Sequence, residues 1–260
     1  MNPRRIYAIV LRHYFLSIHQ MERFFDAFLY PVLVLLLWGF LSTYIGSIKS
    51  SGLIAFLLGG LILWVIFERV NTDLGLSFMY DVWERNIINV LSSPVTFVEF
   101  ICGLVIVGLS KIVFSFILMA AIAAVFYQFQ IGSLGFSLLL FAINLIIFAW
   151  SFGIFNLALI FRFGHSIGPI TWILPFLLQP FSAVFYPVGV LPVFFQKVAW
   201  FLPISHVFEG MRGVLSGHTF DYRQFLIAFA LNLVYLGLSI VFFYVTLDGV
   251  KKNGRLVKLI

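Results

Sequence analysis

His206, Glu209 and Arg212 stand at three-residue steps in the stretch FLPISHVFEGMRGVLSG. On a helix this spacing places an imidazole, a carboxylate and a guanidinium on one face, where they could bind a charged ligand or hold one another. Glu209 and Arg212, at positions i and i+3, can form an ion pair, and a half-buried charge without a partner is costly. We interpret the pair as structural, with direct contact to a substrate as the alternative, and His206 as a packed histidine and not a ligand.

Few other residues could build an active site. The chain has 10 Asp and Glu and 5 His among 260 residues, and its sequence contains no HExxH motif, paired His ligand set or GxSxG elbow. Gly103 and Gly108 have the spacing of a phosphate loop, but Leu109 follows where that motif has its lysine. We therefore expect no catalytic residue, no metal site, no cofactor and no nucleotide bound by this chain.

The composition is that of a membrane protein. Hydrophobic residues make up 62% of the chain and charged residues 10%, and the mean hydropathy is +1.10, far from the values of soluble domains. The formal net charge is +6, but the basic residues flank apolar runs and form no stripe along a polar surface, which argues against nucleic acid as a partner. Cys102 is the only cysteine, so no disulfide can form within the chain.

Six apolar runs approach the roughly 20 residues that a helix needs to cross a ~30 Å hydrocarbon core. We predict an all-α polytopic membrane protein, a single transmembrane domain over residues 1–260 with six transmembrane helices. The predicted spans cover about 27–46, 53–70, 101–126, 135–161, 169–188 and 223–247. The predicted divisions are an interfacial helix (1–26), spans one and two (27–70), a polar cytoplasmic segment (71–100), spans three to five (101–188), a re-entrant hairpin (189–222), span six (223–247) and a basic tail (248–260).

Several segments are predicted to lie at the membrane surface or only dip into it. Residues 3–25 form an amphipathic helix with a basic stripe that suits the headgroup region. Residues 77–91 repeat polar and apolar side chains at helical spacing, which predicts a second amphipathic helix outside the bilayer. After span five, prolines and charges interrupt the apolar sequence, so we expect two short helices that enter the membrane and return. The second is predicted over 204–216, with Pro203 in its first turn and Ser205 as its cap.

Basic residues indicate which side of the membrane each loop occupies. Most of the 16 Lys and Arg residues lie in the N-terminal segment, the segment after span two, the loop after span four and the C-terminal tail. The positive-inside rule therefore places both termini in the cytoplasm. The opposite side has only Lys49, Lys197, Arg212 and Arg223.

Two stretches carry a resemblance to a known family. WERNIINVLSSPVTFVEF, residues 83–100, has an acid-base pair, a short helix and a small-residue-Pro-Val turn. FYPVGVLPVFFQKVAWFLPISHVFEGMRGVLSG, residues 185–217, has an aromatic-Pro step, a Leu-Pro step, a further proline and a Glu-x-x-Arg pair. Both are similar to segments of the membrane subunit of type-2 ATP-binding-cassette exporters, and the resemblance covers essentially the whole chain. Where that family usually has Gly-Thr after the acid-base pair, this chain has Asn86 and Ile87.

The resemblance implies a permease that carries an amphiphile, such as a drug, glycolipid, polysaccharide or lipid, across the plasma (inner) membrane. It implies that a separate cytosolic ATPase subunit hydrolyses ATP, that this chain is not an enzyme, and that two copies pair as a homodimer among membrane lipids. Residues 77–91 then correspond to a coupling helix that docks on the ATPase, with an interfacial helix anchored by Trp83 and Tyr80 as the alternative. The residues implied in coupling are Asp81, Trp83, Glu84 and Arg85, and those implied in an exit hairpin are Pro187, Pro192, Pro203, Glu209 and Arg212.

Lys111 stands alone about ten residues into the predicted third span. Snorkelling of its long side chain to the cytoplasmic edge is the favoured interpretation, and contact with an anionic cargo or lipid headgroup is the alternative. Aromatic residues crowd around span five and the hairpin, where packing against lipid is the simpler interpretation. Trp172 and Tyr186 are the candidates for a substrate path if these aromatics also contact cargo.

Two other classes of protein are kept as alternatives. An ion-gradient-driven transporter or channel would need acidic residues or broken helices near the middle of the membrane, and the sequence has few. A membrane-embedded enzyme would need a polar cluster within one cavity. Transport without ATP, or turnover of a lipid substrate by the chain alone, distinguishes these classes from the exporter.

Overall fold

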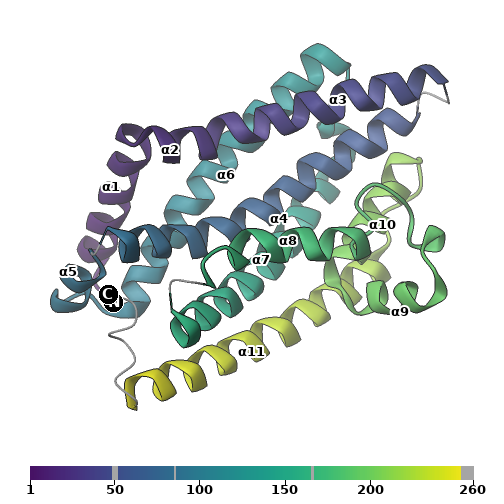
Figure 1. Cartoon of the computed structure of the whole chain (residues 1–260). Helices are drawn as coiled ribbons and strands as arrows, with labels where there is room; N and C mark the ends of the chain where they lie inside the picture. The colour runs from purple at the N-terminus through teal and green to yellow at the C-terminus, as the bar shows by residue number, and fades with distance from the viewer. Residues whose placement is uncertain (49–51, 85, 165–166, 253–260) are drawn as a thin grey trace.

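The computed structural model describes residues 1–48, 52–84, 86–164 and 167–252, and every regular element within these ranges is helical. The predicted all-α class is therefore confirmed for the described residues. Figure 1 shows long helices running side by side, with shorter helices at both ends. The elements are α1 (Pro3–His19), α2 (Met21–Phe24), η1 (Phe25–Leu29), α3 (Tyr30–Ile48), α4 (Gly52–Trp83), α5 (Ile87–Ser92), α6 (Phe97–Tyr127), η2 (Ile131–Leu134), α7 (Phe136–Phe163), α8 (Ile170–Leu178), η4 (Gln179–Phe181), η5 (Val188–Val190), α9 (Val193–Phe201), α10 (Pro203–Leu215) and α11 (Tyr222–Lys252).

Four helices in the described part of the chain are long and apolar enough to cross a membrane. They lie in α4, α6, α7 and α11 and correspond to predicted spans two, three, four and six. Two shorter apolar helices, in α3 and in α8 with η4, stand where spans one and five are predicted. A polytopic membrane protein is thus confirmed, whereas six complete crossings remain a prediction.

The predicted fifth span, residues 169–188, does not form a single crossing helix. The 9 residues of α8 and the 3 residues of η4 rise only about 20 Å, against a hydrocarbon core of ~30 Å. Pro175 lies inside α8 and Pro180 lies in η4, and neither has the N–H that a continuing helix needs. The chain leaves η4 at Phe181 and runs without regular structure to η5.

Residues 77–91 do not form the separate amphipathic helix that the sequence predicts. α4 continues without a break from Gly52 to Trp83, and the 6 residues of α5 form a second helix. The reason is that Leu74, Phe78 and Met79 are buried together with the polar residues around them, so neighbouring helices surround this part of α4. The 32 residues of α4 rise about 48 Å, so roughly a dozen of them extend beyond a ~30 Å core.

The predicted N-terminal helix over residues 3–25 is also interrupted. Gln20 has an extended backbone (φ −96°, ψ 110°), so α1 ends at His19 and the chain continues through α2 and η1 into α3 in a new direction (Figure 1). Ile9 and His13 form part of the buried side of α1, which packs along α6. The bend lets α1 lie across one end of the bundle while α3 joins its long helices.

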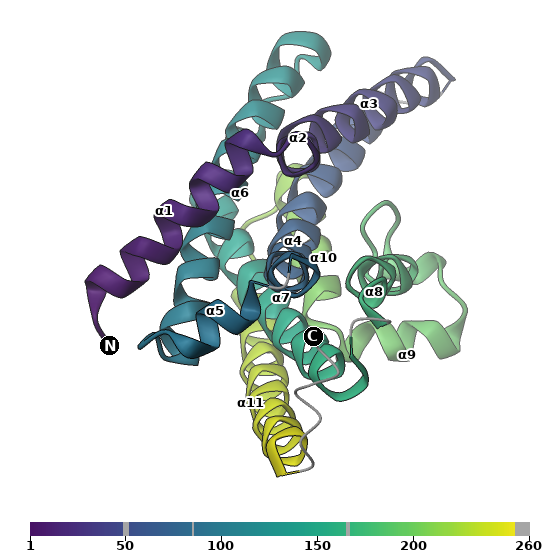
Figure 2. The same cartoon turned by 60° about the vertical axis from the view of Figure 1, so that its left-hand side comes forward.

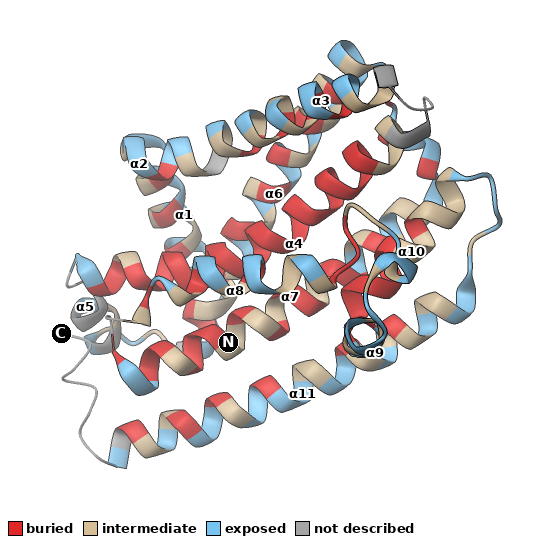
Figure 3. Cartoon of the chain, turned by 45° about the vertical axis from the view of Figure 1, so that its right-hand side comes forward, coloured by how far each residue is buried: buried red, intermediate tan, exposed pale blue. Residues whose placement is uncertain are grey.

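α4 is the central helix of the molecule. Every residue from 57 to 79 is buried, and α4 contacts α3, α6, α7, α8 and α10 (Figure 3). α1, α5 and the end of α11 lie at one end of the bundle, whereas α9, α10 and the start of α4 lie at the other (Figure 1). A single helix therefore joins the two ends.

Glycine allows the segment that follows η4 to touch α4. A Cβ on Gly60 would lie 2.6 Å from the carbonyl oxygen of Val184, which is closer than real Cβ atoms approach a backbone. Trp38 of α3 stacks on Phe185 of the same segment, with ring centroids 4.1 Å apart. The segment is thereby held against both α3 and α4.

Gly60→Ala should lower the melting temperature of the purified protein. The added methyl group has no space beside the Val184 carbonyl, and overpacking of this kind costs about 1–3 kcal/mol. Gly237→Ala is the matched control, because nothing lies within 4 Å of a Cβ at that position of α11, and alanine is favoured over glycine inside helices. Thermal unfolding in detergent, followed by circular dichroism, measures both variants, and equal melting temperatures would contradict the close approach.

Candidate functional site

Ion pairs join α1 and α2 to the last turn of α4. Arg12 of α1 binds the Asp81 carboxylate, and His13 Nε2 lies 3.5 Å from the second oxygen of that carboxylate. Arg23 of α2 binds Glu84 Oε1 at 2.7 Å. Figure 2 views this end of the bundle, with α1 lying along α6 and α5 beside them.

Two further pairs connect the N-terminal segment to α4 and α6. Arg69 of α4 binds Asp26 of η1 at 2.8 Å, and Arg5 lies 3.7 Å from Glu99 at the start of α6. In both pairs one side chain is buried and its partner is about a third exposed, so the buried charge has an opposite charge beside it. We call the following set the ion-pair series: Arg5–Glu99, Arg12–Asp81, Arg23–Glu84 and Asp26–Arg69.

The residues predicted to couple to an ATPase differ in exposure. Asp81 is 0% exposed beneath α1, so it ties α1 to α4 and presents no surface to a partner. Trp83 is 45% exposed, and its ring packs edge-on against Tyr80 with centroids 5.7 Å apart. Glu84 is exposed but already paired with α2, and Arg85 lies outside the described residues. A docking role for these residues stays a prediction.

Lys111 is not the isolated lysine that the sequence suggests. Its Nζ lies 3.5 Å from Asp73 Oδ1 of α4, and both side chains are largely buried. Counted from Tyr127 at the far end of α6, Lys111 stands about 24 Å along the helix, close to the edge of a ~30 Å core. The ion pair gives the lysine charge a partner within the chain, and contact with cargo stays a prediction.

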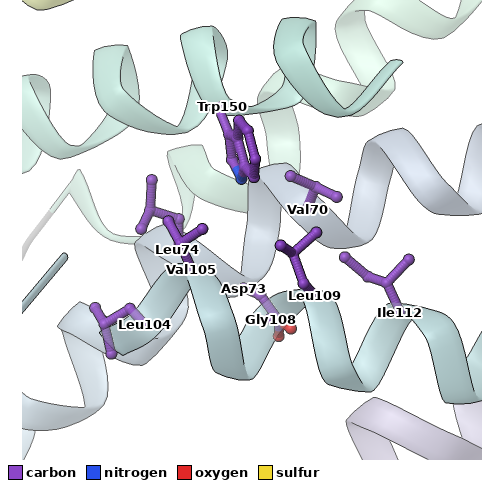
Figure 4. Close-up of a pocket in the computed structure, with 9 residues that line it drawn as sticks. All are labelled: Val70, Asp73, Leu74, Leu104, Val105, Gly108, Leu109, Ile112 and Trp150. Atoms are coloured by element: carbon purple, nitrogen blue, oxygen red, sulfur yellow. The ribbon is translucent and has the colours of Figure 1, made fainter. Parts of the chain in front are cut away.

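The space beside this pair is small. A cavity of about 10 Å³ between α4, α6 and α7 is lined by residues that include Asp73, Gly108 and Trp150 (Figure 4). Figure 4 shows the Asp73 carboxylate next to Gly108. A water molecule needs about 10–15 Å³, so an amphiphile does not fit between these three helices.

At the opposite end, α10 supplies partners for the backbone that follows η4. Arg212 Nη1 donates to the carbonyl oxygen of Ala183 at 2.6 Å, and Glu209 Oε1 accepts the N–H of Val188 at 2.6 Å. Arg212 Nη2 also donates to Glu209 Oε1 at 2.9 Å, so the ion pair expected from their spacing is present. We call the two side chains, with the Ala183 carbonyl and the Val188 N–H, the backbone clamp.

The clamped segment has a backbone that needs such partners. Ala183 is fully buried in a left-handed conformation (φ 55°), which is uncommon for a residue other than glycine. A carbonyl without a donor is costly at membrane depth, and Ser205 Oγ donates to the Phe181 carbonyl at 3.2 Å. The sequence predicted that Ser205 caps α10, and this prediction is wrong, because α10 begins at Pro203 and has no side-chain cap. Ser205 instead donates a hydrogen bond to the clamped segment.

The other residues named for the hairpin mark its turns and its packing. Pro187 precedes η5, Pro192 precedes α9, and Pro203 begins α10. The two short helices predicted before the last span are therefore present. Tyr186 OH donates to the Pro180 carbonyl at 2.6 Å, whereas Trp172 is 41% exposed on the outer side of α8. Their contact with a substrate stays a prediction.

His206 is a packed histidine, as its surroundings in the sequence indicate. Its Nδ1 lies 2.7 Å from Gln224 Oε1, and its Nε2 lies 2.8 Å from the carbonyl oxygen of Trp200. Both ring nitrogens are therefore occupied by protein, and the ring joins α9, α10 and α11. No group of three or more metal-ligating residues is found in the described part of the chain.

Sequence reasoning missed a buried polar contact between α4, α7 and α8. Pro175 has no N–H for the carbonyl of Thr171 four residues earlier, and Asn71 Nδ2 donates to that oxygen at 3.4 Å. Asn156 Nδ2 donates in turn to Asn71 Oδ1 at 3.0 Å, and the three polar side chains are fully buried. The available signal was a proline four residues after a threonine, together with single asparagines within apolar runs.

Comparison with known proteins gives one family and a group of relatives. A family model described as ABC-2 type transporter matches residues 4–216. The chain is similar to the inner membrane transport permease YadH of Escherichia coli K12, with 26% identity over 205 residues that cover 75% of this chain and 78% of that protein. The proteins of the same name from Escherichia coli O157:H7 and Shigella flexneri show the same identity and coverage.

Arg212→Gln should destabilise the protein by about 1.5–3 kcal/mol, the contribution of a hydrogen bond to a charged group. The Ala183 carbonyl loses its donor and Glu209 loses its cation. Arg223→Gln is the matched control, because Arg223 is exposed near the start of α11. Thermal unfolding measures both. A loss of transport in Arg212→Gln with an unchanged melting temperature would instead support direct contact with a substrate.

Proposed function

The chain belongs to the ABC-2 type transporter family as a permease subunit, and we propose that it exports its substrate using ATP hydrolysed by a separate subunit. The observation that carries the proposal is the continuity of α4. This helix runs unbroken from the end that holds α5 and the ion-pair series to the end that holds the backbone clamp. A rigid element of this kind transmits movement of one end to the other.

The proposed contact for the ATPase is the exposed surface of α5 and the last turn of α4. Trp83, Glu84 and Asn89 are exposed there. The ion-pair series ties the end of α4 to α1 and α2, and it ties α1 to α6, so a partner that displaces the end of α4 displaces these helices with it. In this scheme Trp83 contacts the partner, whereas Asp81 is a positioning residue that keeps α1 on α4.

We also propose that two copies of the chain pair and that the substrate passes between them. The cavity beside Asp73 is only about 10 Å³, which supports a path outside the helices of one chain. α8 exposes Trp172 and Phe176, and together with η4 it is too short to cross the membrane. We propose that a second copy packs against this exposed aromatic side. The substrate is then an amphiphile, such as a drug, glycolipid, polysaccharide or lipid, that follows these aromatic side chains.

The proposed location is the plasma (inner) membrane, with both termini in the cytoplasm. The name of the YadH relatives, inner membrane transport permease, supports the location. The start of α1 and the end of α11 lie at the same end of the bundle, which supports an even number of crossings (Figure 1). The basic N-terminal segment supports a cytoplasmic side for that end.

Trp83→Ala should reduce co-purification with the ATPase and transport-coupled ATP hydrolysis about tenfold, a loss of about 1.4 kcal/mol of contact. Its melting temperature should hardly change, because the ring is 45% exposed. Asp81→Asn is the matched comparison and should lower the melting temperature, because Arg12 loses its carboxylate. Unchanged export after Trp83→Ala and Glu84→Gln together, or transport by the purified chain without ATP, would contradict the proposal.

Labelling of single cysteines tests the orientation. In a Cys102→Ser background, a membrane-impermeant maleimide should label His218→Cys in intact cells, because this exposed residue lies between α10 and α11 on the proposed outer side. Asn89→Cys, in an exposed position of α5, should be labelled only after permeabilisation. The opposite pattern would reverse the orientation.

A further inference from the structure

An open cavity of about 420 Å³ lies between α1, α5 and the start of α6, at the end of the bundle that holds the ion-pair series. Its interior is apolar and is formed in part by Ile9 of α1, Val90 of α5 and Val95. None of the contacts of the ion-pair series crosses from α1 to α5. The cavity thus separates two elements that the series does not join directly.

Three basic residues contribute to the lining of the cavity. They are Arg4, Arg5 and Arg12, all from α1. Arg5 faces Glu99 and Arg12 binds Asp81, whereas Arg4 is exposed and has no carboxylate partner among the described residues. A mostly apolar lining that also contains arginines suits an amphiphile that has an anionic headgroup.

The place of Arg4 on α1 favours a lipid over an acidic protein segment. Leu11, Phe15 and Ile18 follow Arg4 at i+7, i+11 and i+14, so they share its side of the helix. All three of these apolar side chains are exposed. A helix with such a side lies at headgroup depth, where the long side chain of arginine reaches lipid phosphates. An acidic segment of a cytosolic protein would not approach through this apolar surface.

We propose that the cavity binds one anionic phospholipid from the leaflet in which α1 lies. Its phosphate binds beside Arg4 and Arg5, and an acyl chain packs against Ile9, Val90 and Val95. The lipid fills the space between α1 and α5, and so holds α5 to the N-terminal helix. The proposal depends on the membrane placement of the chain and is independent of export and of the ATPase.

Native mass spectrometry of the purified full-length chain in detergent tests the proposal. The probes are phosphatidylglycerol and phosphatidylcholine with identical acyl chains. We expect the protein to retain one molecule of phosphatidylglycerol in preference to phosphatidylcholine. Arg4→Gln should reduce this preference about fivefold, the effect of one basic residue near an anionic headgroup. Arg4→Lys should restore most of it. Arg223→Gln, an exposed arginine at the other end of the bundle, should leave the preference unchanged.

Several results would overturn the proposal. Inorganic phosphate should not displace the lipid, because the apolar interior holds the acyl chain, so displacement would identify a site for a free anion. Equal retention of the two lipids, or an unchanged preference in Arg4→Gln, would show that the arginines of the cavity do not select an anionic headgroup. Loss of the lipid when the ATPase subunit is added would assign the cavity to the protein contact. Because the first measurements use neither ATP nor a partner, their failure leaves the proposed export function untouched.

Discussion

α4 carries charged side chains through a part of the molecule that other helices surround, and such charges are stable only beside an opposite charge or a polar donor. Each charged residue on this helix from Glu68 to Asp81 has a partner on a different element. The positions of α1, η1, α3 and α6 around α4 follow in part from this requirement, because moving any of them away would leave a buried charge alone. The partners are Tyr30 for Glu68, Asp26 for Arg69, Lys111 for Asp73, and Arg12 for Asp81.

The same constraint acts on the backbone at the other end of the bundle. α8 contains a proline and the chain then loses its helical hydrogen bonds, so carbonyl and N–H groups are left at membrane depth. Asn71 of α4 donates a hydrogen bond to one of these carbonyl groups, and Ser205 and Arg212 of α10 donate to two more. The carboxylate of Glu209 accepts a hydrogen bond from a backbone N–H. The Glu-x-x-Arg pair is therefore explained by the irregular segment beside it, and no substrate is needed to account for its charges.

These two sets of contacts meet on one helix. The ion-pair series holds the last turns of α4, and the close approach at Gly60 brings the clamped segment against its other half. In the proposed coupling, a displacement applied at Trp83 is carried toward the hairpin by α4, which runs without a break from Gly52 to Trp83. This continuity gives the proposed coupling to an ATPase a physical route.

Hydrophobicity and local spacing by themselves determined that this is an α-helical membrane protein, where its four long helices lie, and that Pro203 begins a short helix with Glu209 paired to Arg212. Those features depend on residues that are close together in the sequence, so they can be predicted from the sequence alone. Only the tertiary structure decided that α4 continues through Asp81 and that Lys111 has a partner. The amphipathic pattern of residues 77–91 suits a surface helix as well as the end of a buried one. The burial of Phe78 and Met79 and the contact of Asp81 with Arg12, 69 residues away in the chain, favour the buried helix. Pairing across such a distance follows from packing, which local periodicity does not specify.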